Sequence, residues 1–115
     1  MKYSIRGEKL EVTDSIREYV MDKLNKMEKY FDDPNNVSVK ILFSVRGREQ
    51  KIEVTINSRG YDLRAEVSHS DMYAAIDLAV DKLERQIRKH KTKMMSRERA
   101  QIVYEDDIYE EESYD

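Results

Sequence analysis

The sequence has 115 residues, a length that suits one compact domain, and 39% of them are charged, against roughly 25% in an average domain. It contains no cysteine, which excludes disulfides, thiolate catalysis and cysteine-ligated zinc. No apolar run approaches the roughly 20 residues of a membrane span, and the N-terminus lacks the apolar core of a signal peptide. We therefore expect a cytoplasmic protein with no membrane partner.

The net charge of -3 is unevenly distributed along the chain. Residues 1–80 carry a net charge of -1, residues 81–96 carry +4 and residues 97–115 carry -6. The acidity therefore belongs to the last segment, and the part expected to fold is slightly basic. Such segregation makes a nucleic-acid-binding surface worth testing.

The first expected elements are a strand over residues 2–7 and an amphipathic helix after it. Apolar residues of the helix recur at spacings of three and four, which places them on one face. These residues are Ile16, Val20, Leu24, Met27 and Phe31. Either Thr13 as N-cap or Ser15 with Glu18 as a capping box marks the start, and Pro34 prevents continuation beyond residue 33.

Three strands are expected over residues 37–45, 50–58 and 61–68, because apolar and polar residues alternate there. The inward set comprises Val37, Val39, Ile41, Phe43, Val45, Ile52, Val54, Ile56, Tyr61, Leu63, Ala65 and Val67. The outward positions are polar except for Leu42. Alternation of this kind predicts a sheet with one buried face and one wet face.

A second helix is expected from Ser70 or Asp71 to about Lys93, with Ser70 as its N-cap. Its apolar stripe consists of Met72, Ile76, Ala79, Leu83 and Ile87. Apolar spacing is lost afterwards, so we expect a folded domain over residues 1–95 and an acidic, disordered tail or linker over residues 96–115.

The expected element order is β-α-β-β-β-α. Each helix has one apolar stripe and the sheet has one apolar face, which predicts an α+β two-layer sandwich with both helices on the same face of a four-stranded sheet. The first strand, helix and second strand should form a right-handed crossover, which makes those two strands parallel.

The sequence offers little for catalysis. His69 and His90 lie 21 residues apart with no carboxylate constellation around them, so surface or capping roles are favoured over a metal or general-base role. No phosphate-binding loop and no nucleophile motif is present. We therefore expect no enzyme activity, no cofactor, no metal and no small-molecule substrate.

The basic segment has an organised geometry on the helical wheel. Lys82, Arg85, Lys89 and Lys93 form one stripe about 16 Å long on one flank of the second helix. Arg88 and Lys91 lie on its other side. The first helix carries Lys23, Lys26 and Lys29 along one flank, and the two helices could line a shared positive groove.

The charge pattern alone leaves several interpretations open. A solvated charged face stabilised by i,i+4 pairs is about as well supported as nucleic-acid binding, and a protein or membrane surface is less favoured. Tyr73 lies beside the basic surface, where such a residue more often packs than offers a stacking platform for a base.

Two long segments resemble the ribosome hibernation promoting factor family, which includes ribosome-associated inhibitor Y. They are "IRGEKLEVTDSIREYVMDKLNKMEKYF" and "SDMYAAIDLAVDKLERQIRKHKTKM", and the resemblance covers residues 1 to about 95. It implies a fold similar to double-stranded-RNA-binding domains. It also implies a factor that occupies the mRNA/tRNA channel of the 30S subunit in stationary phase or stress, contacts 16S rRNA and inhibits translation.

Carried onto this chain, the resemblance implies rRNA phosphate contacts from the basic residues of both helices, with packing or rRNA contact for Tyr73. The basic set is Lys23, Lys26, Lys29, Lys82, Arg85, Arg88, Lys89, Lys91 and Lys93. The segment "EDDIYEEESYD" resembles the end of the long form's linker, so a truncated long form is expected, with a natural short form as the other possibility. Ribosome dimerisation would then need a C-terminal domain outside this chain. A protein-interaction module that modulates a sigma factor remains the alternative function.

Overall fold

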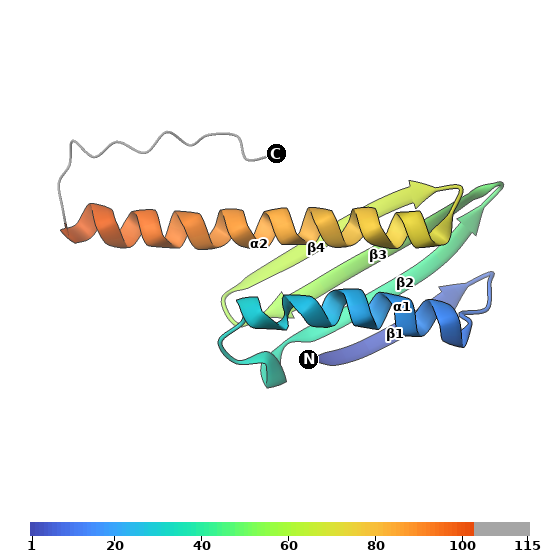
Figure 1. The fold of residues 1–115 in the computed structure, drawn as a ribbon, viewed down its shortest axis with the longest axis horizontal. Helices are drawn as coiled ribbons and strands as arrows, with labels where there is room; N and C mark the ends of the chain where they lie inside the picture. The colour runs from blue at the N-terminus through green and yellow to red at the C-terminus, as the bar shows by residue number, and fades with distance from the viewer. Residues whose placement is uncertain (103–115) are drawn as a thin grey trace.

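The computed structural model describes the backbone of residues 1–102 and the side chains of residues 1–91. A four-stranded sheet forms one layer, and helices α1 and α2 lie together on one of its faces (Figure 1). The expected tail residues 103–115 lie outside the described part of the chain. The elements are β1 (Lys2–Glu8), α1 (Asp14–Asn25), the 3₁₀ segments η1 (Lys26–Tyr30) and η2 (Pro34–Asn36), β2 (Ser38–Arg46), β3 (Glu49–Ser58), β4 (Tyr61–His69) and α2 (Met72–Ile102).

The strands follow one another across the sheet in the order β1-β2-β3-β4. Strand β1 pairs in parallel with β2, as the predicted crossover requires, and the other pairs are antiparallel. The register puts Ile5 beside Ile41, Ile41 beside Val54 and Val54 beside Ala65. Apolar residues therefore form continuous rows on one face, which confirms the predicted α+β class and the buried face of the sheet.

The core lies between that face and the two helices. The helical stripe residues Met72, Ile76, Ala79, Leu83 and Ile87 are all buried, as are the inward strand residues from Val37 to Phe43. Among the described residues, no polar or charged side chain is buried. Three residues of the expected apolar sets, Ile16, Val45 and Tyr61, are only partly buried because they lie near the ends of their elements. Burial of each large aliphatic side chain contributes about 1.5–3 kcal/mol, so this layer supplies most of the stability.

The start of α1 agrees with the first of the two alternatives. The Thr13 hydroxyl accepts a hydrogen bond of 3.2 Å from the backbone N–H of Ile16, which makes Thr13 the N-cap. After Asn25 the chain tightens into the 3₁₀ segment η1, which apolar spacing did not predict. Met27 remains buried across this change, and Phe31 follows in an extended conformation.

The ends of α2 differ from the expectation in two ways. Asp71, rather than Ser70, caps the helix, because its carboxylate accepts the backbone N–H of Tyr73 at 3.0 Å. His69 holds this turn by accepting the N–H of Asp71 on Nδ1 at 2.9 Å. The helix also continues past Lys93 to Ile102, so residues 96–102 are helical rather than part of a disordered tail. Those residues contain good helix formers and neither Gly nor Pro, and loss of an apolar stripe does not by itself end a helix.

Gly7 offers a test of how the loop after β1 closes against the strand. A methyl group at Gly7 would lie 2.5 Å from the carbonyl oxygen of Leu10 and 3.0 Å from Cγ2 of Val12. Backbone must move to relieve the first contact, so Gly7→Ala should lower the free energy of unfolding by about 1–3 kcal/mol. Urea unfolding followed by circular dichroism measures this change in the free energy of unfolding. The control is Ser4→Ala, on the exposed face of β1. Equal stability of the two variants would contradict the close approach.

Candidate nucleic-acid interface

Helices α1 and α2 run side by side in the same direction over the sheet (Figure 1). Two contacts four residues apart on each helix fix this arrangement. The rings of Tyr19 and Tyr73 meet edge to face at 4.9 Å, and Lys23 Nζ lies 3.4 Å from a carboxylate oxygen of Asp77. The flank of α1 that carries Lys23 therefore faces α2, as the shared-groove expectation requires.

Asp77 organises this contact electrostatically. It accepts a hydrogen bond of 2.8 Å from the Tyr19 hydroxyl and the ion pair from Lys23. The hydrogen bond raises the pKa of Tyr19, and the Asp77 charge raises the pKa of Lys23. Lys23 also lies 5.3 Å from the centroid of the Tyr19 ring. Lys23 is thus firmly protonated but engaged with a carboxylate of its own chain.

The other two basic residues of the first helical region lie in η1. Side chains three residues apart in a 3₁₀ segment lie one above the other, so Lys26 and Lys29 are on the same face. Both are exposed, and Lys29 Nζ lies 5.3 Å from the ring centroid of Tyr30. The tightening of the helix therefore aligns two cations that an α-helix would place about 60° apart.

An aromatic stack brings the end of η1 close to the basic part of α2. Tyr61 at the start of β4 lies 6.3 Å from the Phe31 ring and 3.8 Å from the His90 ring, centroid to centroid, and is nearly parallel to both. This assigns His90 a packing role on the extension of the core stripe. Because Phe31 directly follows η1, the stack anchors η1 near the α2 turn that contains His90.

The flank of α2 that faces α1 carries two of the predicted cations. Arg88 is 11 residues after Asp77 and Lys91 is 18 residues after Tyr73, separations that return to nearly the same helical angle. Arg88 and Lys91 therefore continue the α1-facing side beyond the Lys23 contact. Arg88 is exposed and Lys91 is partly exposed.

The opposite flank of α2 faces the free edge of β4. Lys82 Nζ donates to the backbone carbonyl of Glu66 at 3.3 Å. The Gln86 amide accepts the N–H of Arg64 at 3.1 Å and donates to its carbonyl at 2.7 Å. The stripe of Lys82, Arg85, Lys89 and Lys93 therefore does not line a groove with α1, and that part of the expectation is wrong. A helical wheel separates two flanks but cannot say which neighbour each one meets.

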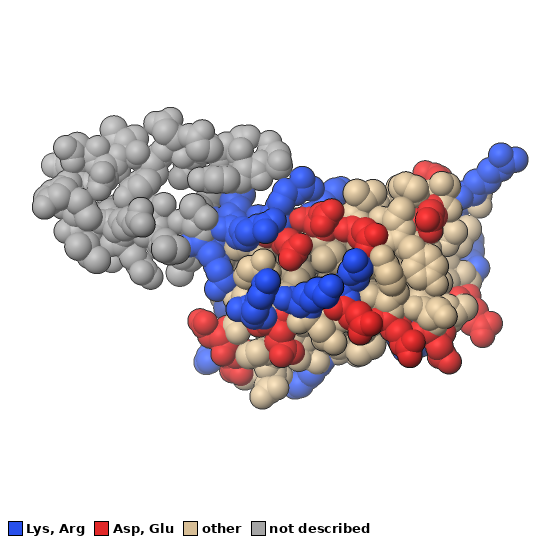
Figure 2. Space-filling model, in the orientation of Figure 1, with Lys and Arg blue, Asp and Glu red and all other residues tan. Residues whose placement is uncertain are grey.

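The described cations of α1, η1 and α2 cover part of the helix side of the domain, and we call this set the helical basic surface. It passes from α1 and η1 across the exposed side of α2 to the β4 edge, and Figure 2 shows Lys and Arg side chains gathered there with acidic side chains among them. Its members are Lys23, Lys26, Lys29, Lys82, Arg85, Arg88, Lys89 and Lys91. Lys93 lies in α2, but its side chain is outside the described part.

Tyr73 combines the two roles considered for it. Its ring packs edge-on against Tyr19, yet 39% of the residue remains exposed at the N-terminal end of the helical basic surface. Sequence reasoning missed Tyr19, Asp77 and Gln86. Only the packing of the two helices shows that Tyr19 and Asp77 meet.

Among the described residues, no group of three or more His, Cys, Asp or Glu is placed to hold a metal ion. No helix within residues 1–102 is long and apolar enough to cross a bilayer.

Comparison with known proteins gives consistent matches. The family described as "Sigma 54 modulation protein / S30EA ribosomal protein" matches residues 3–95. The ribosome hibernation promotion factor of Bacillus subtilis is 45% identical, with all of this chain aligned to 70% of that protein. The protein of the same name from Lactococcus lactis is 47% identical, with 89% of this chain aligned to 56% of it.

The fold is also found in solved structures. The N-terminal domain of Protein Y from Thermus thermophilus superposes with a TM-score of 0.72 at 36% identity, over 78% of this chain and 99% of that one. The relatives from Bacillus subtilis and Lactococcus lactis are longer than the part that this chain covers, so their whole-protein activities do not transfer directly.

The β4 edge gives the second testable prediction. Gln86→Ala removes both hydrogen bonds to the Arg64 backbone, which should lower the free energy of unfolding by about 1 kcal/mol. It should also promote self-association, because an uncovered edge strand pairs with other chains. Urea unfolding and sedimentation velocity measure the two effects. The control is Gln50→Ala, which loses a single 3.3 Å hydrogen bond to Ser70. If Gln86→Ala behaves like the control in both assays, the edge is protected by other means.

Proposed function

The chain belongs to the sigma 54 modulation protein / S30EA ribosomal protein family, and from that premise we propose that it is a ribosome hibernation factor that binds the 30S subunit at the mRNA/tRNA channel. The family consists of ribosome-associated factors and not of enzymes, which confirms the expectation that the chain is not an enzyme. Binding there would inhibit translation in stationary phase or stress, in the cytoplasm where ribosomes work. Residues 1–95 would form the ribosome-binding domain.

One observation carries this proposal: a member of this family has cations from two separate helical regions gathered into a single helical basic surface. RNA phosphates are bound chiefly by Lys and Arg, and release of counterions makes such binding strong at low salt and weak at high salt. The surface also curves over α2, so it offers contacts to more than one strand of a folded rRNA. The proposed contacts come from all its members, from Lys93 and from Tyr73.

The proposal is restricted to what the given chain can do. The chain spans 70% and 56% of the Bacillus and Lactococcus relatives. Pairing of ribosomes is therefore assigned to no residue of this chain.

A second candidate function is modulation of a sigma factor, which the description of the matching family names. Such a role would use protein contacts, which depend on apolar surface and change little with salt. The exposed large apolar residues described in this chain are Tyr73 and Leu78 alone, at 39% and 45% exposure. That is a small apolar area beside an extensive charged one, so RNA binding is the better supported role.

The proposed surface can be tested by charge reversal. Replacing Lys82, Arg85 and Lys89 with Glu should reduce 30S binding at least a hundredfold, because three phosphate contacts become repulsions. Sucrose-gradient co-sedimentation at two salt concentrations measures this. A matched control reverses Arg46, Arg48 and Arg59, which lie exposed at the hairpin turns and change the net charge equally. The proposal fails if the first variant still co-sediments as the wild type does, or if both triple variants lose binding equally.

The ion pair between Lys23 and Asp77 predicts a variant that binds RNA more tightly than the wild type. Asp77→Asn should tighten binding about two- to fivefold, because it removes a carboxylate that competes with RNA phosphate for Lys23. The pKa of Lys23 falls toward its ordinary value of 10.5, so the residue stays charged at neutral pH. Fluorescence anisotropy with a 16S rRNA fragment measures affinity. The control is Asp62→Asn on the exposed face of β4. Weaker binding of Asp77→Asn would show instead that Asp77 positions Lys23.

A further inference from the structure

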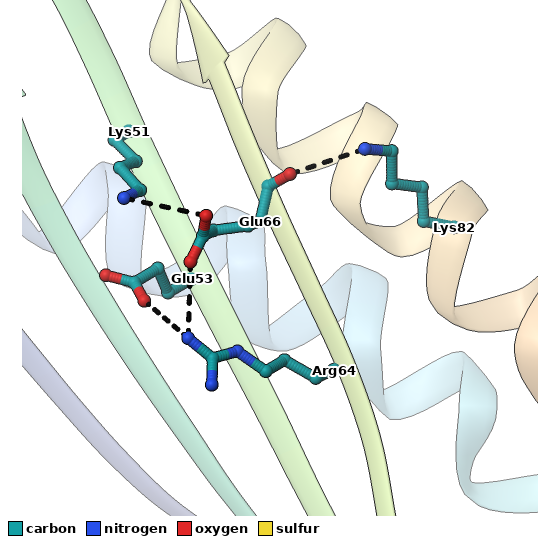
Figure 3. A network of polar contacts seen from close by, with 5 residues as sticks. All are labelled: Lys51, Glu53, Arg64, Glu66 and Lys82. Atoms are coloured by element: carbon teal, nitrogen blue, oxygen red, sulfur yellow. Dashed lines mark hydrogen bonds and ion pairs between the residues drawn. The ribbon is translucent and has the colours of Figure 1, made fainter.

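The face of the sheet that points away from the helices is divided into two electrostatically different halves. On the β3–β4 half the charged side chains neutralise one another (Figure 3). Arg64 contacts Glu53 at 3.1 Å and Glu66 at 3.2 Å, and Lys51 contacts Glu66 at 3.6 Å. Glu53 and Glu66 lie directly opposite each other in the register, so these cations also relieve a repulsion between like charges.

The titration of Glu66 is consistent with this closed network. The side-chain contact with Glu53, then the charge of Lys51 and the hydrogen bond from Arg64, lower the pKa of Glu66. The carboxylate therefore stays ionised and keeps both cations engaged. Little positive charge remains on this half for an external partner.

The cations of the β1–β2 half form no ion pair among the described residues, and Glu53, which lies diagonal to Lys40 across β2 and β3, is engaged by Arg64. Lys2, Ser4 and Arg6 alternate outward along β1, since Tyr3 and Ile5 pack on the core side. Lys40 of β2 lies beside Ser4 in the parallel register, which places it diagonally next to both Lys2 and Arg6. Such diagonal positions are about 7–8 Å apart, within reach of long side chains.

These three cations are exposed, and within the described part of the chain none of them makes an ion pair. The nearest carboxylate along β1 is Glu8, at the end of the strand, and it pairs in register with Ser44 rather than with a cation. Three positive charges around one serine repel one another in the free protein. An anion between them would relieve that repulsion.

We propose that Lys2, Ser4, Arg6 and Lys40 form a second RNA phosphate-binding site, on the opposite side of the domain from the helical basic surface. The ligand class is an RNA backbone, because Lys, Arg and Ser are typical phosphate ligands. A protein interface needs an apolar centre, and Leu42 is the single large apolar side chain pointing outward on this half. This inference rests on the proposed function for one point, that the bound RNA is rRNA. It places RNA on both faces of the sandwich.

The test compares three neutralised variants. The first replaces Lys2, Arg6 and Lys40 with Gln. The matched control replaces Arg46, Arg48 and Arg59 with Gln, for the same change in net charge at exposed turns. A single Lys40→Gln variant keeps the test valid if the triple variant unfolds. Binding to 30S subunits and to protein-free 16S rRNA is measured at several salt concentrations.

We expect the first variant to bind both targets at least tenfold more weakly than the wild type and the control. The slope of log affinity against log salt concentration should be smaller in magnitude by about two to three, because each lost phosphate contact removes about 0.9 from it. The inference is overturned if affinity and slope match the control, or if binding to 30S falls while binding to protein-free 16S rRNA does not, since the partner is then a protein. Failure of the proposed function is distinct, because then the wild type itself would not bind 30S.

Discussion

The fold depends on the coverage of one face of a small sheet. Apolar residues of four strands fall into shared rows because the register aligns them, and water must be removed from that face for the domain to be stable. Two helices do this, and each can bury only one stripe. Their remaining surface and the far face of the sheet stay in water. The charged residues thus have two separate places to gather, and the core is kept free of them.

The packing of the helices then decides which cations act together. Tyr19, Asp77 and Lys23 join α1 to α2 through an edge-on ring contact, a hydrogen bond and an ion pair. Tyr61 joins the end of η1 to α2 by stacking between Phe31 and His90. These contacts hold Lys26 and Lys29 close to the turn of α2 that carries Arg88 and Lys91. The positive region is therefore preorganised by aromatic and polar contacts that are not themselves basic.

Most of the sandwich was predictable from the sequence because burial of one face of each element requires apolar residues at a regular spacing. The alternation from Val37 to Val67 and the stripe from Met72 to Ile87 each have one arrangement that removes their apolar surface from water. The N-cap of α2 was not predictable in this way, since Ser70 and Asp71 are both good caps and His69 decides between them by holding the N–H of Asp71. The end of α2 was missed because helix propensity continues after the apolar period stops.

The surface was predicted less completely than the core for a related reason. A wheel gives angles about a helix axis, and periodicity sets which stripe is buried but not what lies beside it. Lys82 was placed correctly on a flank, yet the neighbour of that flank is the β4 edge, where Gln86 covers the Arg64 backbone. No residue pattern within α2 distinguishes that edge from α1. Only the order of the strands and the position of each helix over them make the distinction.

In the proposed RNA complex, equal charges of the helical basic surface would therefore contribute unequally to binding. Lys23 must leave Asp77, and Lys82 must leave the carbonyl of Glu66, before either makes its best contact with a phosphate. Each of these losses offsets much of what an exposed charge contact contributes. Arg85 and Arg88 have no ion pair or hydrogen bond with the other described side chains, so their contacts come without that cost. Arginine also binds phosphate through two parallel hydrogen bonds. On these grounds Arg85 and Arg88, rather than the more numerous lysines of the same surface, should contribute most of the net affinity for RNA in the proposed complex.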